Sequence, residues 1–285
     1  MTIADIFNDP YMLSLVIKAL TVGFLVSLCA SVLGVCLVLD RFSMIGDGLS
    51  HVGFFALSVA TVLKMSDLKL EIAMPIVVLA ALLIFYIKDK SKINGDASIA
   101  VISTGAIAVG SILFNFSGKR NSDICNSLFG SSSVITLTDR ELIISIVLSV
   151  VCLIFFFVFY SQIFSVTFDE SFARATGLQT KFYRVMTAVL TAVTIVVGME
   201  MMGAVMISAL VVFPALSSMR VCKSFKGVVL LSALLGVICF VVGFFAAVRF
   251  SFQTGPAVVS VHVIAFIIFS VIGVAIAAFK KKTGK

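Results

Sequence analysis

The chain has 285 residues, of which 61% are hydrophobic and 12% are charged, and its mean hydropathy is +1.21. That balance excludes a soluble globular domain, because apolar runs of about 20 residues, long enough to cross a bilayer, recur along the whole sequence. The net charge of +7 comes from Lys and Arg scattered over short loops without an aromatic-rich basic face, which excludes a nucleic-acid-binding protein.

Hydropathy predicts helices that cross the membrane. The apolar segments show no strand-like alternation, so we expect an all-α polytopic membrane protein with about eight or nine transmembrane helices and a single transmembrane domain over residues 1–285. The predicted spans, in chain order, are 12–39, 43–63, 72–87, 97–117, 142–163, 182–197, 203–219, 227–248 and 256–279.

Lys and Arg collect on one side of this predicted bundle. Most of the 21 basic residues lie in the loop 88–92, in the loops that alternate with it and in the C-terminal tail. Positive residues favour the cytoplasmic side, so we expect a cytoplasmic C-terminus, an outside N-terminus and an external loop at 118–141. The N-terminus lacks the basic start of a cleavable signal peptide, and we expect it to belong to the mature protein.

A carboxylate and an imidazole stand four residues apart near the start of the second predicted span. On a helix this spacing puts the side chains of Asp47 and His51 on the same face. Ionisable groups inside a membrane bundle are functional candidates by default, and this pair is typical of a divalent-cation site. The alternative is structural: Asp47 pairs with Arg41 or caps the helix, and His51 is a core histidine. Its support is that Asp47 lies about one turn from the cytoplasmic end of its span.

The predicted cytoplasmic segment 167–181 has the signals of a short helix. Thr167 and Glu170 fit a capping box, and Gly177 fits a helix stop. The apolar residues on one side of such a helix are Phe168, Phe172 and Ala175. The pattern leaves two interpretations open: a connector on the membrane surface, or a docking element for a cytoplasmic partner.

Two further residues are weaker candidates for ion ligands. Glu200 lies in the Met-rich stretch 198–203, between two predicted spans at the outer mouth, where methionines more often provide adaptable packing. His262 lies about two turns into the last predicted span. It is either an extra ligand or, more in keeping with its surroundings, a core histidine that donates to a backbone carbonyl.

The sequence does not have the signatures of an enzyme. The six cysteines include no C-x-x-C pair and are expected to pack as small hydrophobes, with only Cys125 in the external loop. No G-x-x-x-x-G-K-[ST] phosphate loop occurs, and two histidines offer little material for acid–base catalysis. A transporter, a channel or a structural subunit remains.

Five segments occur in a recognisable order: RFSMIGDGLSH at 41–51, LFG at 128–130, DESFARATGL at 169–178, GAVMISALVVFPA at 203–215 and GPA at 255–257. Together they resemble the permease subunits of bacterial ATP-binding-cassette importers for zinc, manganese and iron, over nearly the whole chain. The first segment is similar to that family's R-x-S-x-x-G-D-x-[LI]-[SA]-H stretch. The fourth is similar to its G-x-x-[LM]-[IV]-x-[AS]-L-[LV]-[IV]-x-P-A signature.

The resemblance implies a homodimeric permease with the fold of a type II ABC importer, in the bacterial cytoplasmic (inner) membrane. A separate cytoplasmic ATPase would hydrolyse ATP, and a separate extracytoplasmic protein would deliver the metal. The chain itself would be a transport subunit without a tightly bound cofactor, and Asp47 and His51 would hold the ion at the subunit interface. The residues that the resemblance implies in ATPase coupling are Asp169, Phe172, Ala173 and Gly177.

The expected cargo is zinc, with manganese or iron as the alternatives, because the same nitrogen and oxygen ligands bind several divalent ions. A rival from another class is a secondary transporter or channel that needs no ATPase. Against it, Asp47 is the one clear carboxylate within a predicted span, which is too few for a proton or sodium relay. A non-transporting membrane scaffold would leave the Asp47–His51 pair unexplained.

Overall fold

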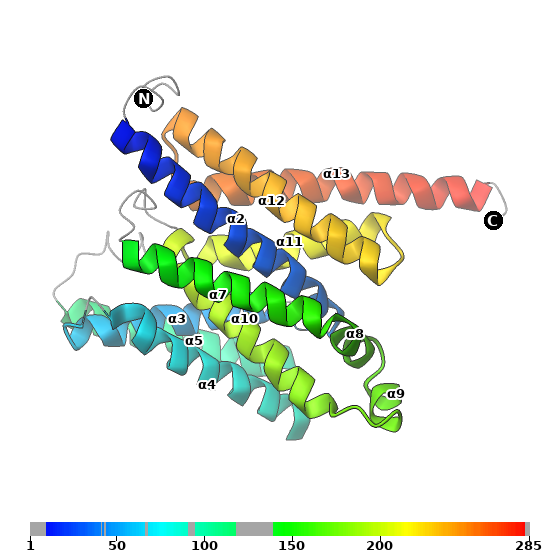
Figure 1. Cartoon of the computed structure of the whole chain (residues 1–285), viewed down its shortest axis with the longest axis horizontal. Helices are drawn as coiled ribbons and strands as arrows, with labels where there is room; N and C mark the ends of the chain where they lie inside the picture. Colours follow the sequence, from blue (N-terminus) through cyan, green and yellow to red (C-terminus); the bar gives the residue numbers. More distant parts are fainter. Residues whose placement is uncertain are drawn as a thin grey trace.

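The computed structural model of the chain describes residues 10–40, 42, 44–65, 68–90, 95–117 and 139–282, and every regular element in them is an α-helix. The helices form a bundle from which the C-terminal part of the last helix projects (Figure 1). Several predictions lie outside the described residues: Arg41, Cys125, segment 128–130 and nearly all of the predicted external loop.

The helices are α2 (Pro10–Leu39), α3 (Ile45–Val62), α4 (Lys69–Lys90), α5 (Gly95–Phe116), α7 (Asp139–Val158), α8 (Tyr160–Phe168), α9 (Glu170–Ala175), α10 (Thr180–Met202), α11 (Ala204–Val221), α12 (Phe225–Phe250) and α13 (Thr254–Lys282). Eight are long and apolar enough to cross a membrane, and α7 and α8, bent by 69° at their junction, make a ninth if the pair counts as one span. The all-α polytopic fold with eight or nine spans is confirmed. The predicted span 142–163 is corrected, because its helix breaks at Phe159.

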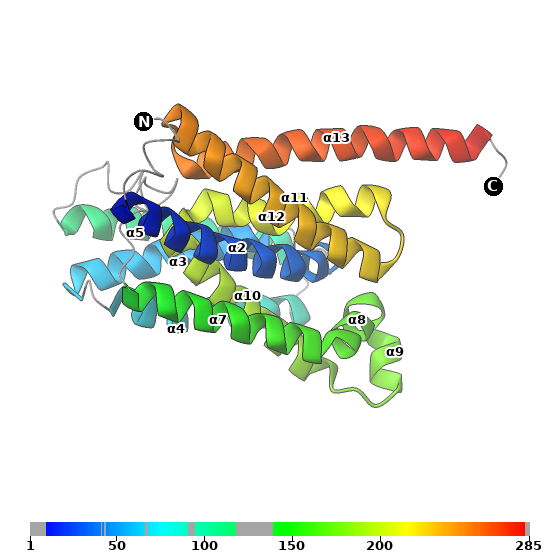
Figure 2. The same ribbon diagram turned by 45° about the horizontal axis from the view of Figure 1, so that its top comes forward.

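Helix α2 lies at the centre of the bundle, where it packs against α7, α10, α11 and α12 (Figures 1 and 2). Small residues permit this packing. A methyl group added at Gly34 would lie 1.9 Å from the Val211 carbonyl oxygen, and one at Gly236 would lie 1.8 Å from the Ser31 hydroxyl. Since lipid tails are as apolar as leucine, close backbone approach of this kind is what holds membrane helices together.

The break between α10 and α11 depends on one glycine. Gly203 has a φ of +90°, which other residues rarely adopt, and its N–H donates to the Met199 carbonyl at 2.9 Å to end α10. The chain then reverses into α11, so that the signature segment 203–215 runs beside α2 and α3. This reversal brings the fourth family-like segment next to the first.

Candidate ion-binding site

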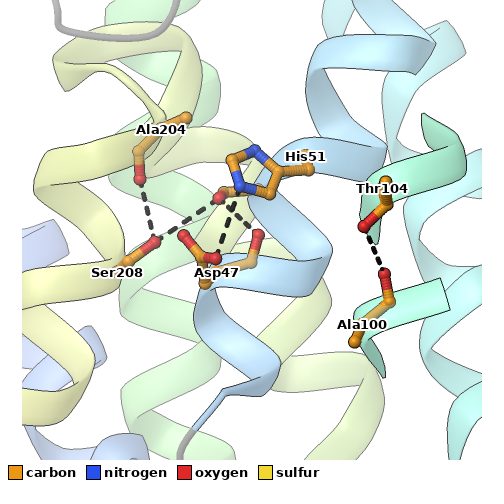
Figure 3. A network of polar contacts seen from close by, with 7 residues as sticks. Asp47, His51, Ala100, Thr104, Ala204 and Ser208 are labelled. Atoms are coloured by element: carbon orange, nitrogen blue, oxygen red, sulfur yellow. Dashed lines mark hydrogen bonds and ion pairs between the residues drawn. The ribbon is translucent and has the colours of Figure 1, made fainter. Parts of the chain in front are cut away.

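The side chains of Asp47 and His51 meet on one face of α3, as their spacing predicts (Figure 3). His51 Nε2 lies 3.3 Å from Asp47 Oδ2. The residue that precedes the helix is Met44, and it makes no side-chain cap. Asp47 is in the first helical turn, where the helix dipole favours a negative charge. Its described side-chain contact is with His51 and not with the helix end, whereas Arg41, the other suggested partner, lies outside the described residues.

The pair has the atoms and the spacing to hold a divalent cation. The Asp47 side chain is 48% exposed and that of His51 is 15% exposed. The Nδ1 atom of His51 is buried and has no hydrogen-bond partner among the described residues. Two ligands at about 2.1 Å from an ion, at a near-tetrahedral angle, lie about 3.4 Å apart. The observed separation of 3.3 Å therefore suits both atoms as ligands of one ion without a change of rotamer.

Helix α11 packs against the turn of α3 that carries the pair. The Ser50 hydroxyl donates to the Asp47 carbonyl at 2.8 Å, and its oxygen lies 3.4 Å from that of Ser208 on α11, which in turn donates to the Ala204 carbonyl (Figure 3). A methyl group at Gly46 would lie 3.6 Å from the Ser208 Cα atom, so the two helices almost touch there. Sequence reasoning missed Ser50 and Ser208 as supports, although each lies inside a family-like segment.

Contacts with the long helices place the pair near the middle of the bundle. Gly46 packs beside Val211, whose carbonyl oxygen lies against Gly34 of α2. One turn earlier on α2, Ser31 packs against Gly236, close to the midpoint of α12. Asp47 is within one turn of the start of α3, as expected, but α3 itself begins at the level of Gly34 and not at the end of α2. Asp47 therefore lies about one and a half turns of α2 deeper than the end of that helix.

The weaker candidates do not join the pair. Glu200 lies inside the last turn of α10 and not between two spans, because α10 extends to Met202, and its Oε1 atom is 4.0 Å from Lys69 Nζ. His262 is buried, and its Nδ1 lies 2.9 Å from the Val258 carbonyl, which confirms the predicted contact of a core histidine. In the described ranges, no group of three or more His, Cys, Asp or Glu side chains is close enough to hold a metal ion. Among the described residues, Asp47 and His51 therefore form a group of two such side chains.

The predicted cytoplasmic helix is present as α9, with a different cap. Thr167 belongs to α8, so the predicted capping box is wrong. The cap is Asp169, whose extended backbone breaks the helix and whose carboxylate accepts from the Phe172 N–H at 2.9 Å. Gly177 is confirmed as the stop. Its φ is +86°, its N–H donates to Arg174, and the next N–H donates to the Ala173 carbonyl at 3.0 Å, which is a Schellman motif.

The predicted apolar face of this helix is also corrected. Ala173 is the buried residue of α9, whereas Ala175 is exposed. Phe168 ends α8 and is 75% exposed, and Phe172 on α9 is 63% exposed. Two aromatic rings are therefore exposed at this end of the bundle, a feature of surfaces that meet either another protein or the membrane. Helix α9 lies at one end of the bundle, beside α8 (Figure 1).

The model of the ABC 3 transport family matches residues 12–273, which make up most of the chain. The chain belongs to the ABC 3 transport family. This membership makes it a multi-pass membrane component of a transport system. The expected family resemblance is confirmed by a match that includes both the α3 pair and α9.

Members of this family with described cargo are similar over most of their length. The chain is 28% identical over 261 residues to "Probable metal transport system membrane protein" of Thermotoga maritima, which covers 92% of this chain and 91% of that protein. It is 27% identical over 251 residues to "Manganese import system permease protein ScaB" of Streptococcus gordonii, with 88% of each covered. Among solved structures, PsaBC from Streptococcus pneumoniae in complex with Fab aligns at a TM-score of 0.80 and 26% identity, over 94% of this chain and 93% of that one. The expected permease-like bundle is thus confirmed.

Proposed function

We propose that the chain is the membrane permease subunit of an ATP-driven importer for a divalent metal ion. The observation that carries this proposal is the Asp47–His51 pair, 3.3 Å apart and partly exposed near the middle of a bundle of the ABC 3 family. A neutral imidazole nitrogen and a carboxylate oxygen are suitable ligands for first-row divalent metals. Two ligands from one chain make a site that releases its ion, as transport requires.

The cargo is one metal of the set zinc, manganese and iron. Zinc is the expectation from the sequence, and manganese is supported by the description of the ScaB relative. The residues do not separate these metals, since imidazole and carboxylate bind all three and the affinities follow the metal more than the site. We therefore keep all three metals as candidates, since relatives described as manganese and iron transport proteins support those two, and assign the choice to the uptake experiment below.

The proposed assembly has three further components. A second copy of the chain would complete the ion path with its own Asp47 and His51, a cytoplasmic ATPase would dock on α9, and an extracytoplasmic metal-binding protein would deliver the ion. The exposed ring of Phe172 supports the docking of a soluble partner. The membrane is the bacterial cytoplasmic membrane, with α9 and the C-terminus inside. In this assembly, ATP hydrolysis belongs to the partner and not to the chain itself.

The geometry suggests how α9 acts on the site. Helix α9 leads through Gly177 into α10, and α10 leads through Gly203 into α11, which carries Ser208 beside Ser50 and the ion pair. A pull on α9 when the ATPase dimer closes would shift α10 and then α11 against α3. Because α3 and α11 are in near contact at Gly46, a small shift would change access to Asp47 and His51.

Competitive uptake of radiolabelled zinc, manganese and iron tests this function. Cells expressing the complete importer would be compared for the parent, Asp47→Ala and His51→Ala, at equal membrane levels, with His262→Ala as the matched histidine control. We expect the parent to take up one metal in preference to the others. In both pair variants the uptake of that metal should fall at least about tenfold, which corresponds to about 1.4 kcal/mol of lost binding free energy. The control should retain uptake, because the described hydrogen bond of His262 is to the backbone of its own helix. Normal uptake in both pair variants would overturn the proposed site, and uptake independent of the ATPase would favour the secondary transporter.

A further inference from the structure

A groove at the α9 end of the bundle combines apolar walls with cationic side chains. It lies between the C-terminal half of α4, the helix α9 and the start of α10, and its volume is about 870 Å³. Its apolar lining includes Leu79, Leu83 and Val185, which come from the membrane-spanning parts of α4 and α10. The Asp47–His51 pair does not line this groove, although α9 and α10 of the proposed gating path do.

The charged end of the groove is positive. Arg174, Lys181 and Arg184 line it together with one carboxylate, Glu170. Glu170 accepts from Arg174 at 2.8 Å and from Arg184 at 3.3 Å, so it orders two guanidinium groups. Lys181 is exposed and has no carboxylate partner among the described residues. Three cationic side chains and one carboxylate line this end of the groove, so its lining is positive on balance.

The apolar part is long enough for one acyl chain. Leu79 and Leu83 also line a second, apolar groove of about 580 Å³ between α3, α4 and α5, so the two grooves share a wall on α4. From Tyr86 in the first groove to Ile76 in the second, α4 rises about 15 Å. That is about half of a 30 Å hydrocarbon core, the depth of one leaflet.

We propose that this groove binds an anionic phospholipid of the cytoplasmic leaflet. The phosphate group would lie against Arg174 and Lys181, and one acyl chain would follow Leu83 and Leu79 along α4. A soluble protein cannot reach the apolar part of the groove, because that part lies within the membrane. A zwitterionic lipid carries no net negative charge to neutralise the excess positive charge of the lining. A cluster of basic residues at the cytoplasmic end of transmembrane helices is the pattern that favours anionic head groups.

The position of the groove gives the lipid a structural role. Arg174 is on α9, and Arg184 is on α10 behind it, so a bound phosphate would bridge the proposed docking helix to the membrane surface. The lipid would hold α9 in a fixed orientation relative to α4. This inference concerns lipid binding alone and does not depend on which ion the protein carries.

Fluorescence quenching by brominated lipids tests the proposal, because the chain contains no tryptophan. Leu83→Trp places a unique fluorophore in the groove, and Val158→Trp places a control on α7, where the side chain is 64% exposed and α8 carries no cation. Each purified variant would be reconstituted in phosphatidylcholine vesicles with brominated phosphatidylglycerol or brominated phosphatidylcholine. At Leu83→Trp we expect the affinity for phosphatidylglycerol to exceed that for phosphatidylcholine at least about fivefold, which is the effect of one basic group at a lipid surface. At Val158→Trp we expect the ratio of the two affinities to be near one.

The charge requirement is tested by R174Q/K181Q in the Leu83→Trp background, which should reduce the preference to near one. Equal quenching of the two reporters, or a preference that the double substitution leaves unchanged, would overturn the proposal. If the double variant keeps its lipid preference but loses the co-purifying ATPase, the groove is a protein contact. Native mass spectrometry of the tryptophan-free chain, counting retained phosphatidylglycerol with and without R174Q/K181Q, gives the same decision without a reporter.

Discussion

The two histidines show how one neighbour decides the chemistry of an imidazole in a membrane. Each makes its described polar contact one helical turn back, His51 with the Asp47 carboxylate and His262 with the Val258 backbone carbonyl. The carbonyl of Val258 belongs to the backbone of the same helix, so the described bond of His262 is local. The carboxylate of Asp47 is a side-chain group that can also bind a cation, as proposed above. Spacing predicted that Asp47 and His51 share a helical face, because a separation of four residues is local to one helix.

Single glycines are a second residue-scale feature, and their roles differ with the space around them. Gly236 lies in the packed contact between α2 and α12, whereas a methyl group at Gly105 would meet nothing within 4 Å. Both are helical, so sequence patterns treat them alike. Only the neighbouring helices distinguish the two positions.

This difference predicts opposite effects on stability. Gly236→Ala forces Ser31 and α2 to move and should lower the free energy of unfolding by about 1–3 kcal/mol. Gly105→Ala is the matched control: it fills open space on a helix and should be neutral or stabilising by up to about 1 kcal/mol. Thermal unfolding of the two variants in the same detergent measures both. Equal melting temperatures would contradict the assigned packing.

At the scale of elements, α9 is a short helix that needs a stop at each end. Six residues cannot stabilise a helix by propagation, so the Asp169 cap and the Gly177 Schellman turn define it. Ala173 attaches the helix to the bundle, and Phe172 faces outward. Helix α9 is thus fixed at both ends and through Ala173, while the exposed ring of Phe172 is available to a partner, as docking requires.

Docking on α9 predicts that Phe172→Ala reduces the amount of co-purifying ATPase by about tenfold or more, as truncation of an aromatic anchor does. The fold should be unaffected, because the ring is 63% exposed. Phe182→Ala, another exposed ring on α10, is the control and should retain the ATPase. Gly177→Ala should give an intermediate loss, since the left-handed turn costs about 1 kcal/mol without glycine. Full ATPase recovery with Phe172→Ala would rule out this docking element.

At the scale of the whole molecule, basic residues gather at the end of the bundle that carries α9. Arg220 ends α11 at this side, and Gly273 of α13 packs against its carbonyl oxygen, so the last part of α13 extends beyond the α11 end. Both views show α9, the α11–α12 turn and the C-terminal end of α13 at the same end of the bundle (Figures 1 and 2). This arrangement agrees with the predicted distribution of Lys and Arg between the loops.

That arrangement predicts a cytoplasmic C-terminus. Green fluorescent protein fused after Lys285 should fluoresce, because it folds in the cytoplasm, whereas alkaline phosphatase at the same position should be inactive. Fusions after Phe250, at the opposite end of α12, should show the reverse pattern and serve as the control. Active phosphatase at the C-terminus would invert the topology and place α9 outside.

Local patterns predicted the number of spans, the helical face shared by Asp47 and His51, the backbone contact of His262 and the stop at Gly177, because each depends on hydropathy or on residues within one turn. Other features depend on where a helix begins or ends: the bend at Phe159, the Asp169 cap and the place of Glu200 inside α10. Hydrophobic periodicity gives little information on such breaks in a mostly apolar sequence. The depth of the pair and its support by Ser208 required the fold, because α3 and α11 are more than 150 residues apart and meet only through the reversal at Gly203.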